Sequence, residues 1–178
     1  MLAGDTYFAD DPENARRAQR AVELADAYYR ATVQGSPDAM DWLRELLGSL
    51  GKGSLIKPPL FVDYGENLHL GDGVFVNFNL TALDVSPIHV GDNCQIGPNV
   101  QLLTPTHPID PELRRAGLES AQPIILEENI WLGGGAIICP GVTIGANSVI
   151  GAGAVVTRDI PSGVVAVGSP ARPVRSIV

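Results

Sequence analysis

The sequence predicts a mainly β fold in which short strands wind into a triangular solenoid, with a small helical segment before it and one loop pushed out of it. Three observations predict this. Aliphatic residues recur at every sixth position over much of the chain, and this period fits neither a helix nor a simple alternating strand. Glycine often follows the aliphatic residue directly. The pattern disappears over residues 103–123 and then returns in the same register.

Residues 1–55 are predicted to form an N-terminal helical segment. Alanine, leucine and tyrosine recur at helical spacing over residues 15–29, with arginine and glutamate between them. Asp11-Pro12 resembles an N-cap followed by a first-turn proline. The sequence Gly-Ser-Pro-Asp at 35–38 interrupts this helix, and a second short helix is expected through residues 42–47.

The solenoid is predicted over residues 56–178, after a lead-in at 54–65. The aliphatic series begins at Leu70 and slips by two residues at Ser86-Pro87. Its members are Leu70, Val76, Ala82, Val90, Ile96, Leu102, Leu126, Leu132, Ile138, Ile144, Ile150 and Val156. Three six-residue sides close one coil, and coils stack at the interstrand spacing of about 4.7–4.9 Å. Glycine and asparagine are expected to supply the backbone angles of the corners.

Composition and charge narrow the classes of function. A length of 178 residues suits one domain with a small appendage. The net charge of -8 argues against a general nucleic-acid binder, so a polyanionic ligand must meet a local basic region. Cys94 and Cys139 match no metal or redox spacing and are expected as reduced, buried thiols of a cytoplasmic protein. We expect neither a signal peptide nor a membrane span.

Several short motifs are more specific than the six-residue period. They are Asn77-Phe78-Asn79, Thr-Pro-Thr-His-Pro at 104–108, Asn-Ile-Trp-Leu-Gly at 129–133, Pro-Gly-Val-Thr-Ile-Gly at 140–145 and Val-Gly-Ser-Pro-Ala-Arg at 167–172. Together with Met-Leu-Ala-Gly at 1–4, they make nearly the whole chain resemble the maltose and galactoside acetyltransferases. These are left-handed parallel β-helix acyltransferases built from hexapeptide repeats. The resemblance implies the left-handed coil and an O-acetyltransferase that uses acetyl-coenzyme A to modify a sugar-like hydroxyl.

The resemblance implies that His107, in the extruded loop, is the catalytic base. A neutral imidazole, whose ordinary pKa is near 6.5, can accept the proton of a sugar hydroxyl as it attacks a thioester. Asn77 matches a family position beside the reacting centre, where its amide can donate to the oxyanion or hold the acceptor. Each residue also has a structural interpretation. His107 can fix a proline-rich loop, and Asn77 can fill a corner of the coil.

Several acidic residues match positions on the acceptor side of the family's site. Asp63 and Asp84 resemble the maltose enzymes more than the galactoside enzymes, and each is equally interpretable as a corner residue. Glu119 is expected to orient the imidazole, touch the acceptor or remain a solvated charge. Asp10 is expected as a further contact, with Asp11 as its alternative. Maltose, glucose, galactosides, a nodulation-type oligosaccharide and a xenobiotic alcohol all stay open as acceptors.

The resemblance also implies a groove for acetyl-coenzyme A. Small residues at Gly133, Gly134 and Ala152 leave room for the pantetheine arm, whose amides can pair like a strand. Trp131 matches a position near the thiol end, unless it serves only packing. Arginines suit phosphates through paired donors. The residues expected toward the nucleotide end are Thr157, Arg158, Arg172 and Arg175.

The family further implies a homotrimer with active sites between subunits, and direct transfer without a metal or an acyl-enzyme. Three alternatives are weighed against it. A γ-class carbonic anhydrase requires three histidine zinc ligands, and the spacing of His69, His89 and His107 lacks that family's close pair. A non-catalytic β-helix would need no histidine in a proline-framed loop. Chloramphenicol- and streptogramin-type acetyltransferases are the nearest alternative substrate class.

Overall fold

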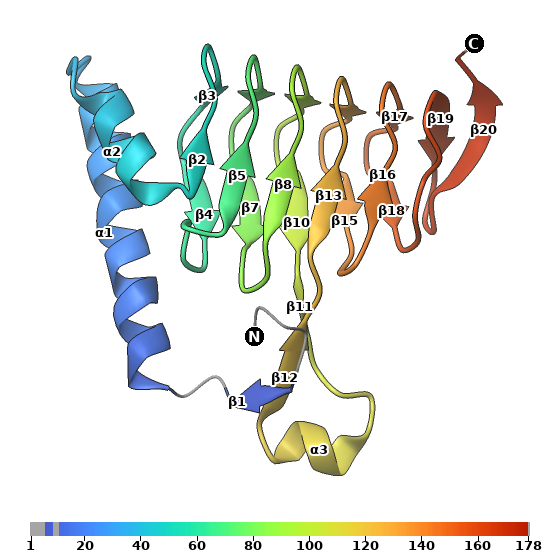
Figure 1. Ribbon diagram of the computed structural model, residues 1–178, viewed down its shortest axis with the longest axis horizontal. Coiled ribbons are helices and arrows are strands. Elements are labelled where there is room, and N and C mark those ends of the chain that lie inside the picture. The colour runs from blue at the N-terminus through green and yellow to red at the C-terminus, as the bar shows by residue number, and fades with distance from the viewer. Residues whose placement is uncertain (1–5, 9–10, 178) are drawn as a thin grey trace.

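The computed structural model describes residues 6–8 and 11–177, which form a three-sided parallel β-helix with two helices across its N-terminal end (Figure 1). Each side is one sheet, and we number the faces in the order in which a coil visits them. The first face contains β2 (Ser49–Leu50), β5 (Leu68–Leu70), β8 (Ile88–Val90), β13 (Ile124–Leu126) and β16 (Thr143–Ile144). The second face contains β3 (Leu55–Ile56), β6 (Phe75–Val76), β9 (Gln95–Ile96), β14 (Trp131–Leu132), β17 (Val149–Ile150), β19 (Val164–Val167) and β20 (Arg172–Ser176). The third face contains β4 (Leu60–Val62), β7 (Leu80–Leu83), β10 (Gln101–Leu103), β15 (Ile137–Ile138) and β18 (Val155–Val156).

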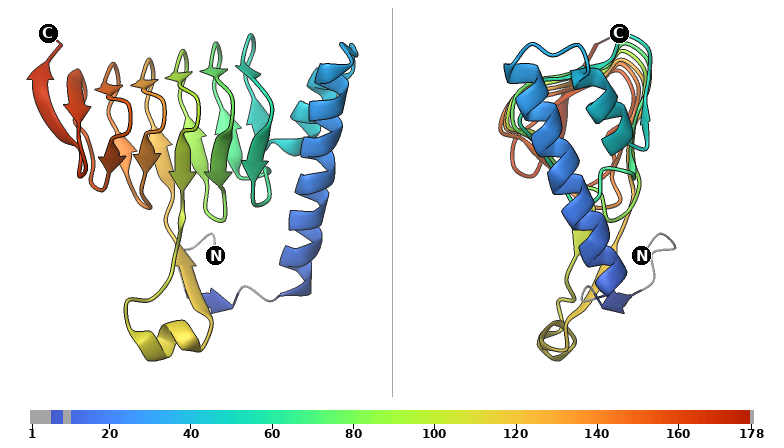
Figure 2. Two further views of the ribbon diagram at one scale, coloured as in Figure 1. Left: turned by 180° about the vertical axis from the view of Figure 1, so that it is seen from behind. Right: turned by 90° about the vertical axis from the view of Figure 1, so that its left-hand side faces the viewer.

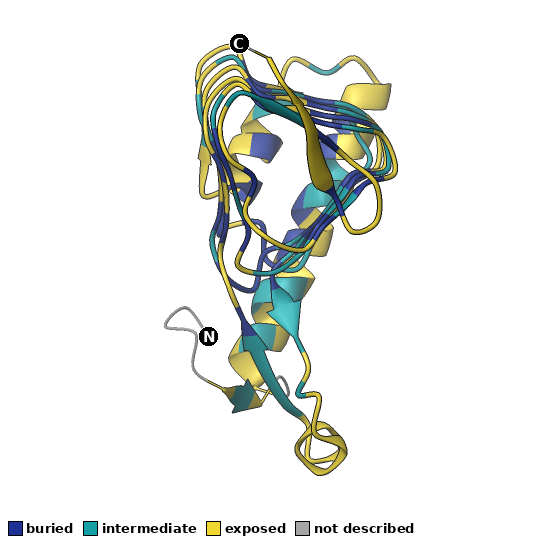
Figure 3. Ribbon diagram, turned by 90° about the vertical axis from the view of Figure 1, so that its right-hand side faces the viewer, coloured by how far each residue is buried: buried dark blue, intermediate teal, exposed yellow. Residues whose placement is uncertain are grey.

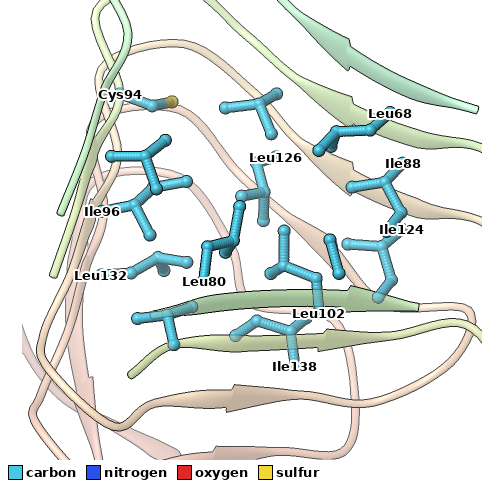
Figure 4. Close-up of a cluster of buried hydrophobic side chains, with 14 of the residues drawn as sticks. Leu68, Leu80, Ile88, Cys94, Ile96, Leu102, Ile124, Leu126, Leu132 and Ile138 are labelled. Carbon is cyan, nitrogen blue, oxygen red and sulfur yellow. The ribbon is translucent and has the colours of Figure 1, made fainter. Parts of the chain in front are cut away.

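The six-residue series forms the core, as predicted. Every member from Leu70 to Val156 is at most 3% exposed. In Figure 4 the side chains of Leu80, Ile96 and Ile124 point toward one another from the three faces, and Figure 3 shows stretches of buried residues along the sides of the triangle. Full burial of one such side chain, relative to leaving it exposed, stabilises the folded state by roughly 1.5–3 kcal/mol. The stack of coils therefore supplies the hydrophobic core that no single coil can make.

The solenoid begins earlier than the sequence indicated. β2 pairs with β5 and β3 pairs with β6, so residues expected as the helical segment and its lead-in already form the first coil. Leu50, Ile56 and Val62 do follow the six-residue period. The next member, Leu70, comes eight positions later instead of six. These two extra residues interrupt the six-residue register, so the first coil could not be recognised from the spacing of its aliphatic residues.

The prediction that glycines take corner angles is confirmed, for example at Gly73, Gly135 and Gly153, but the glycines directly after the aliphatic series have another role. Their φ angles are not positive; the left-handed positions lie two residues later, for example at Asn99 and Gly135. The glycines are needed because neighbouring coils come close. A Cβ on Gly97 would lie 2.6 Å from the backbone nitrogen of Gly134, and one on Gly133 would lie 2.5 Å from that of Ala152. The prediction that asparagines take corner angles is confirmed for Asn79, Asn93 and Asn147.

Two helices close the N-terminal end of the prism (Figure 2). α1 (Pro12–Val33) starts at the predicted cap, where the side chain of Asp11 accepts a hydrogen bond from the backbone N–H of Glu13 at 2.7 Å. Leu24 and Tyr28 of α1 join the same core cluster as the coils. α2 (Ala39–Leu46) adds its buried residues Leu43 and Leu46. Among the described residues, no helix has the length and apolar character needed to cross a membrane.

The segment 103–123 leaves the coil, as predicted, but it contains regular structure. β11 (Pro105–Thr106) leads out, α3 (Pro111–Arg115) turns the chain, and β12 (Leu118–Ala121) returns. β1 (Tyr7–Phe8) pairs with β12, giving a three-stranded antiparallel sheet in the order β1-β12-β11. We call this the protruding sheet, and Figure 1 shows it below the body of the solenoid.

Candidate active site

One corner of the prism gathers most of the predicted acidic residues and His107. This third corner joins the third face to the first face, at residues 63–67, 84–87 and 104–123 in three successive coils. Since β4, β7 and β10 are neighbours in one sheet and β5, β8 and β13 in the next, these segments lie above one another. The first two carry the two-residue insertions, and the third carries the protruding sheet. The insertions and the excursion therefore build one site.

A cavity of about 360 Å³ opens at this corner. Its walls come from the third corner, from the protruding sheet and from the first turns of α1. It is lined by Tyr7, Asp11, Asn14, Ala15, Ala18, Asp63, Tyr64, Leu83, Val85, Pro105, His107 and Glu119. Three carboxylates, those of Asp11, Asp63 and Glu119, face a space that no lysine or arginine lines. The cavity is suited to a neutral ligand with several hydroxyl groups, because carboxylates are hydrogen-bond acceptors.

His107 lies at the mouth of this cavity, directly after β11. Its side chain is 62% exposed, and its Nδ1 is 3.8 Å from Oε1 of Glu119, whose side chain is 23% exposed. Tyr7 donates a hydrogen bond from its hydroxyl to Oε2 of Glu119 at 3.1 Å. The carboxylate is thus hydrogen-bonded to the phenol on one side and faces the imidazole on the other. With Nδ1 directed at Glu119, the other ring nitrogen is left to act on a ligand.

Asp63 is a partly buried carboxylate in the wall of the cavity. Desolvation by burial, followed by the negative charges of Asp84 and Glu119, raises the pKa of Asp63 to about 6. The folded protein therefore holds this proton more tightly than the unfolded chain does. As pH rises from the unfolded pKa toward the folded one, the free energy of unfolding falls. A carboxylate whose charged form lowers the stability of the protein, and which is nevertheless kept in a cavity, is typical of a functional site.

We expect Asp63→Asn to show this directly. Because asparagine cannot ionise, the free energy of unfolding of the variant, relative to the wild type, should rise by about 1–2 kcal/mol between about pH 4 and about pH 8. This figure is discounted because Asp63 is partly exposed. Urea unfolding at the two pH values measures it. Asp38→Asn is the matched control for the change from carboxylate to amide, since Asp38 is exposed, makes no side-chain cap bond and does not line the cavity. An Asp63→Asn variant that loses stability at the higher pH would contradict this account.

Asp84 takes the structural role and not the predicted acceptor contact. It is 0% exposed. Its Oδ1 accepts from the backbone N–H groups of Asp63 at 3.0 Å and Tyr64 at 2.9 Å, and its Oδ2 accepts from that of Asn67 at 3.1 Å. The insertion in the first coil leaves these N–H groups without strand partners, and the carboxylate above satisfies them. Asp84 therefore holds the corner that presents Asp63.

Of the two N-terminal candidates, Asp11 lines the cavity while also capping α1. Asp10 lies outside the described residues. Sequence analysis missed Tyr7 and Tyr64, which also line the cavity. Neither has a local sequence signal. Tyr7 reaches the site only through long-range pairing with β12, and Tyr64 only through the insertion in the first coil.

A second hollow, of about 290 Å³, lies along the second corner, which joins the second face to the third. It is lined by Phe75, Asn77, Gln95, Ile96, Gly97, Pro98, Trp131 and Gly134. Oδ1 of Asn77 accepts from the backbone N–H of Phe78 at 2.9 Å, which leaves the amide NH₂ available as a donor. Trp131 is 56% exposed beside this groove. Lys57, which sequence analysis did not single out, places its Nζ 4.8 Å from the ring centre of Phe78.

The small residues predicted for the groove differ in role. Gly134 is half-buried and lines the hollow, and Ala152 is exposed at the same corner of the next coil. Gly133 is buried, and coil packing explains it. The basic residues divide between two places. Thr157 and Arg158 are exposed on the third corner, whereas Arg172 and Arg175 lie on β20 at the end of the second face.

The structure therefore separates the predicted site residues of one chain into two groups. His107, Glu119 and Asp63 gather at the third corner, and Asn77, Trp131 and Gly134 gather at the second. The third face lies between these corners. Neither the cavity nor the second hollow is lined by both His107 and Asn77.

The three histidines do not converge. His69 and His89 stack on the outside of the first face, with ring centres 4.9 Å apart, while His107 belongs to the protruding sheet. Over residues 6–8 and 11–177, no group of three or more histidine, cysteine, aspartate or glutamate side chains is placed to hold a metal ion. This arrangement gives no support to the carbonic-anhydrase alternative.

Comparisons with known proteins agree with this geometry. The profile described as bacterial transferase hexapeptide (six repeats) matches residues 123–158, and the profile described as maltose acetyltransferase hexapeptide capping motif matches residues 1–51. A galactoside O-acetyltransferase of Lactococcus lactis is 41% identical over 174 residues, which is 97% of this chain and 84% of that protein. The crystal structure of a maltose O-acetyltransferase from Clostridium difficile has a TM-score of 0.97 at 42% identity, covering 99% of this chain and 95% of that one. A galactoside acetyltransferase in complex with coenzyme A has a TM-score of 0.93 at 37% identity, covering 99% of this chain and 88% of that one.

Proposed function

Because this chain belongs to the maltose and galactoside O-acetyltransferase family of hexapeptide-repeat proteins, we propose that it moves the acetyl group of acetyl-coenzyme A to a hydroxyl of a sugar, with His107 as general base. The observation that carries the proposal is His107 at the mouth of a carboxylate-lined cavity, with Glu119 behind its Nδ1. A general base in this position accounts for roughly 10²–10⁴-fold of the rate. Positioning of the two substrates accounts for much of the rest.

The cavity at the third corner is the proposed acceptor site. Asp63 and Glu119 lie beside His107 in its wall, and Asp11 faces them from the start of α1. Carboxylates bind sugars well because each accepts hydrogen bonds from more than one hydroxyl. These three carboxylates favour a sugar over a xenobiotic alcohol that offers them few hydroxyls. The acceptor ring is expected to lie between Asp63 and the protruding sheet.

The groove along the second corner is the proposed site of the pantetheine arm. Gly134 and Ala152 leave space beside it, and Trp131 offers an exposed ring at one side. The free amide NH₂ of Asn77 is a donor that can stabilise the negative oxygen of the tetrahedral intermediate. Thr157, Arg158, Arg172 and Arg175 are proposed to bind the nucleotide end. The similar galactoside acetyltransferase whose structure contains coenzyme A supports this choice of co-substrate.

We further propose a homotrimer whose active sites lie between subunits. The acceptor cavity and the groove occupy different corners of one chain. A neighbouring copy that packs its second corner against the third corner would bring both halves together. It would also bring Arg158, on the third corner, toward the groove of that neighbour. Closed cyclic symmetry repeats this contact at each interface.

The proposed reaction is direct transfer within a ternary complex. The acceptor hydroxyl gives its proton to the unprotonated ring nitrogen of His107, and its oxygen bonds to the acetyl carbonyl carbon. The carbon–sulfur bond then breaks, and the leaving thiolate takes the proton from the imidazolium.

Burial raises the pKa of both Cys94 and Cys139, which argues against either thiol as an acetyl carrier. Both cysteines are free, which supports the predicted cytoplasmic location.

An acceptor panel with acetyl-coenzyme A tests this function, with release of free thiol as the readout. Maltose, glucose, a galactoside, an N-acetylglucosamine oligosaccharide and chloramphenicol represent the open classes. Thiol release that depends on a neutral sugar is expected. Release with chloramphenicol alone would transfer the assignment to the xenobiotic class, and no release with any acceptor would remove the proposed activity.

A further inference from the structure

The protruding sheet places three side chains in one row. In the pairing of β11 with β12, Pro105 lies opposite Ala121 and Thr106 opposite Ser120. If this register is continued by one residue beyond the end of β11, His107 comes opposite Glu119. In the pairing of β1 with β12, Tyr7 lies opposite Glu119. Residues directly opposite one another in antiparallel strands share a face, so His107, Glu119 and Tyr7 stand side by side.

The contacts within the row are divided between the two carboxylate oxygens. Tyr7 donates to Oε2 of Glu119 at 3.1 Å, and Oε1 of the same group lies 3.8 Å from Nδ1 of His107. Neighbouring hydroxyls of Thr106 and Ser120 are 2.7 Å apart and fasten β11 to β12. Burial and the carboxylate of Glu119 raise the pKa of Tyr7, so its hydroxyl stays a donor throughout the neutral range.

We infer that Tyr7 is a positioning residue for the acetyl-transfer reaction, acting on His107 through Glu119. The phenol fixes one oxygen of the carboxylate, so the other oxygen stays directed at Nδ1, 3.8 Å away, where its negative charge favours a proton on that nitrogen. The opposite ring nitrogen then remains unprotonated and aimed at the acceptor hydroxyl. The inference rests on the proposed function and adds to it a strand from the N-terminal segment, far from the loop in sequence.

The same geometry gives β1 a second consequence. Tyr7 packs beside the small cluster formed by Tyr64, Val85 and Ala121 at the base of the cavity. The aromatic ring therefore anchors the strand, while the hydroxyl alone makes the link to Glu119. Replacing Tyr7 with phenylalanine removes the link and retains the anchor, so this variant separates positioning from packing.

The experiment is a double-mutant cycle of Tyr7→Phe and Glu119→Ala, with the best acceptor of the wild type. For Tyr7→Phe we expect kcat to fall about 10-fold to 100-fold, as for loss of a hydrogen bond to a charged group, while KM for acetyl-coenzyme A is unchanged. In the Glu119→Ala background the same change should have almost no further effect, since Tyr7 acts through Glu119. Tyr29→Phe is the matched control, because Tyr29 lies on the exposed side of α1, and it should retain wild-type kcat.

Two results would overturn the inference. One is a Tyr7→Phe enzyme with wild-type kcat. The other is a double variant whose fold-decrease in kcat equals the product of the two single decreases. That result would mean that Tyr7 acts independently of Glu119. Thermal unfolding of each variant checks that the protruding sheet is retained, and the cycle still gives the coupling if the variants differ in stability. A wild type that is inactive on all acceptors removes the proposed function and, with it, this role of Tyr7, whereas either of the two results above in an active enzyme removes the inference alone.

Discussion

The His107→Ala variant loses about 10²–10⁴-fold in kcat, while its folding and its KM for acetyl-coenzyme A remain those of the wild type. The loss is confined to kcat because the imidazole acts on the proton that moves in the transition state. Stability is retained because the side chain of His107 is 62% exposed, and exposed positions contribute little to the free energy of unfolding. Steady-state kinetics with thiol detection, together with thermal unfolding, measures both quantities.

His89→Ala is the matched control for this prediction. His89 is an exposed histidine on the first face, stacked on His69 and away from the protruding sheet. Its removal should leave kcat unchanged. If His107→Ala keeps wild-type kcat, the imidazole is not the base, and His107 serves only to fix the proline-rich loop.

The Asp84→Ala variant is expected to be the most destabilised of the single substitutions in the site. It leaves the buried N–H groups of Asp63, Tyr64 and Asn67 without the carboxylate that accepts them. Each buried unsatisfied group costs about 1–3 kcal/mol, so a total of about 3 kcal/mol or more is expected. Since the corner also holds Asp63, the KM for the acceptor should rise as well. Urea unfolding and acceptor kinetics measure the two effects.

Asp92→Ala provides the comparison for Asp84. Asp92 also accepts from a backbone N–H, that of Asp72 at 2.8 Å, but this bond is exposed. Water replaces such a partner, so the variant should lose no more than about 1 kcal/mol. An Asp84→Ala variant as stable as the wild type, but with poor use of the acceptor, would mean that Asp84 contacts the acceptor directly.

The core of the fold was predictable because one rule repeats. Each coil requires an inward aliphatic residue at the same place, so the core residues from Leu70 to Val156 can be identified from their spacing alone. The first coil was missed because the insertion before Leu70 shifts the register once more. Glycine serves two purposes that the sequence does not separate: a left-handed angle at positions such as Gly135, and a close approach between coils at positions such as Gly97 and Gly133.

The site was harder to predict than the fold because it depends on long-range pairing. His107 stands in a recognisable motif, but its neighbour Glu119 is defined only by the register of β11 and β12. Tyr7 reaches the row across a separation of 112 residues. Spacing alone also leaves open whether a corner aspartate faces solvent or backbone. In the structure Asp63 lines the cavity, whereas Asp84 is buried against the backbone.

In the proposed trimer, the base on the third corner of one chain works with the groove on the second corner of another. Co-assembly of His107→Ala with Gly134→Leu tests this pairing of corners. Gly134 has no positive φ angle, and a Cβ there would lie 3.3 Å from Pro98, a tight contact that requires Pro98 to shift slightly. The leucine is expected to narrow the groove that Gly134 and Pro98 line, and thermal unfolding checks that the variant folds. Each variant alone should be inactive. In a mixed cyclic trimer, one interface of three pairs an intact His107 with an intact groove, so doubly tagged complexes should recover about one third of the wild-type kcat. Mixed complexes that remain as inactive as the two parents would show that each active site is built within one chain.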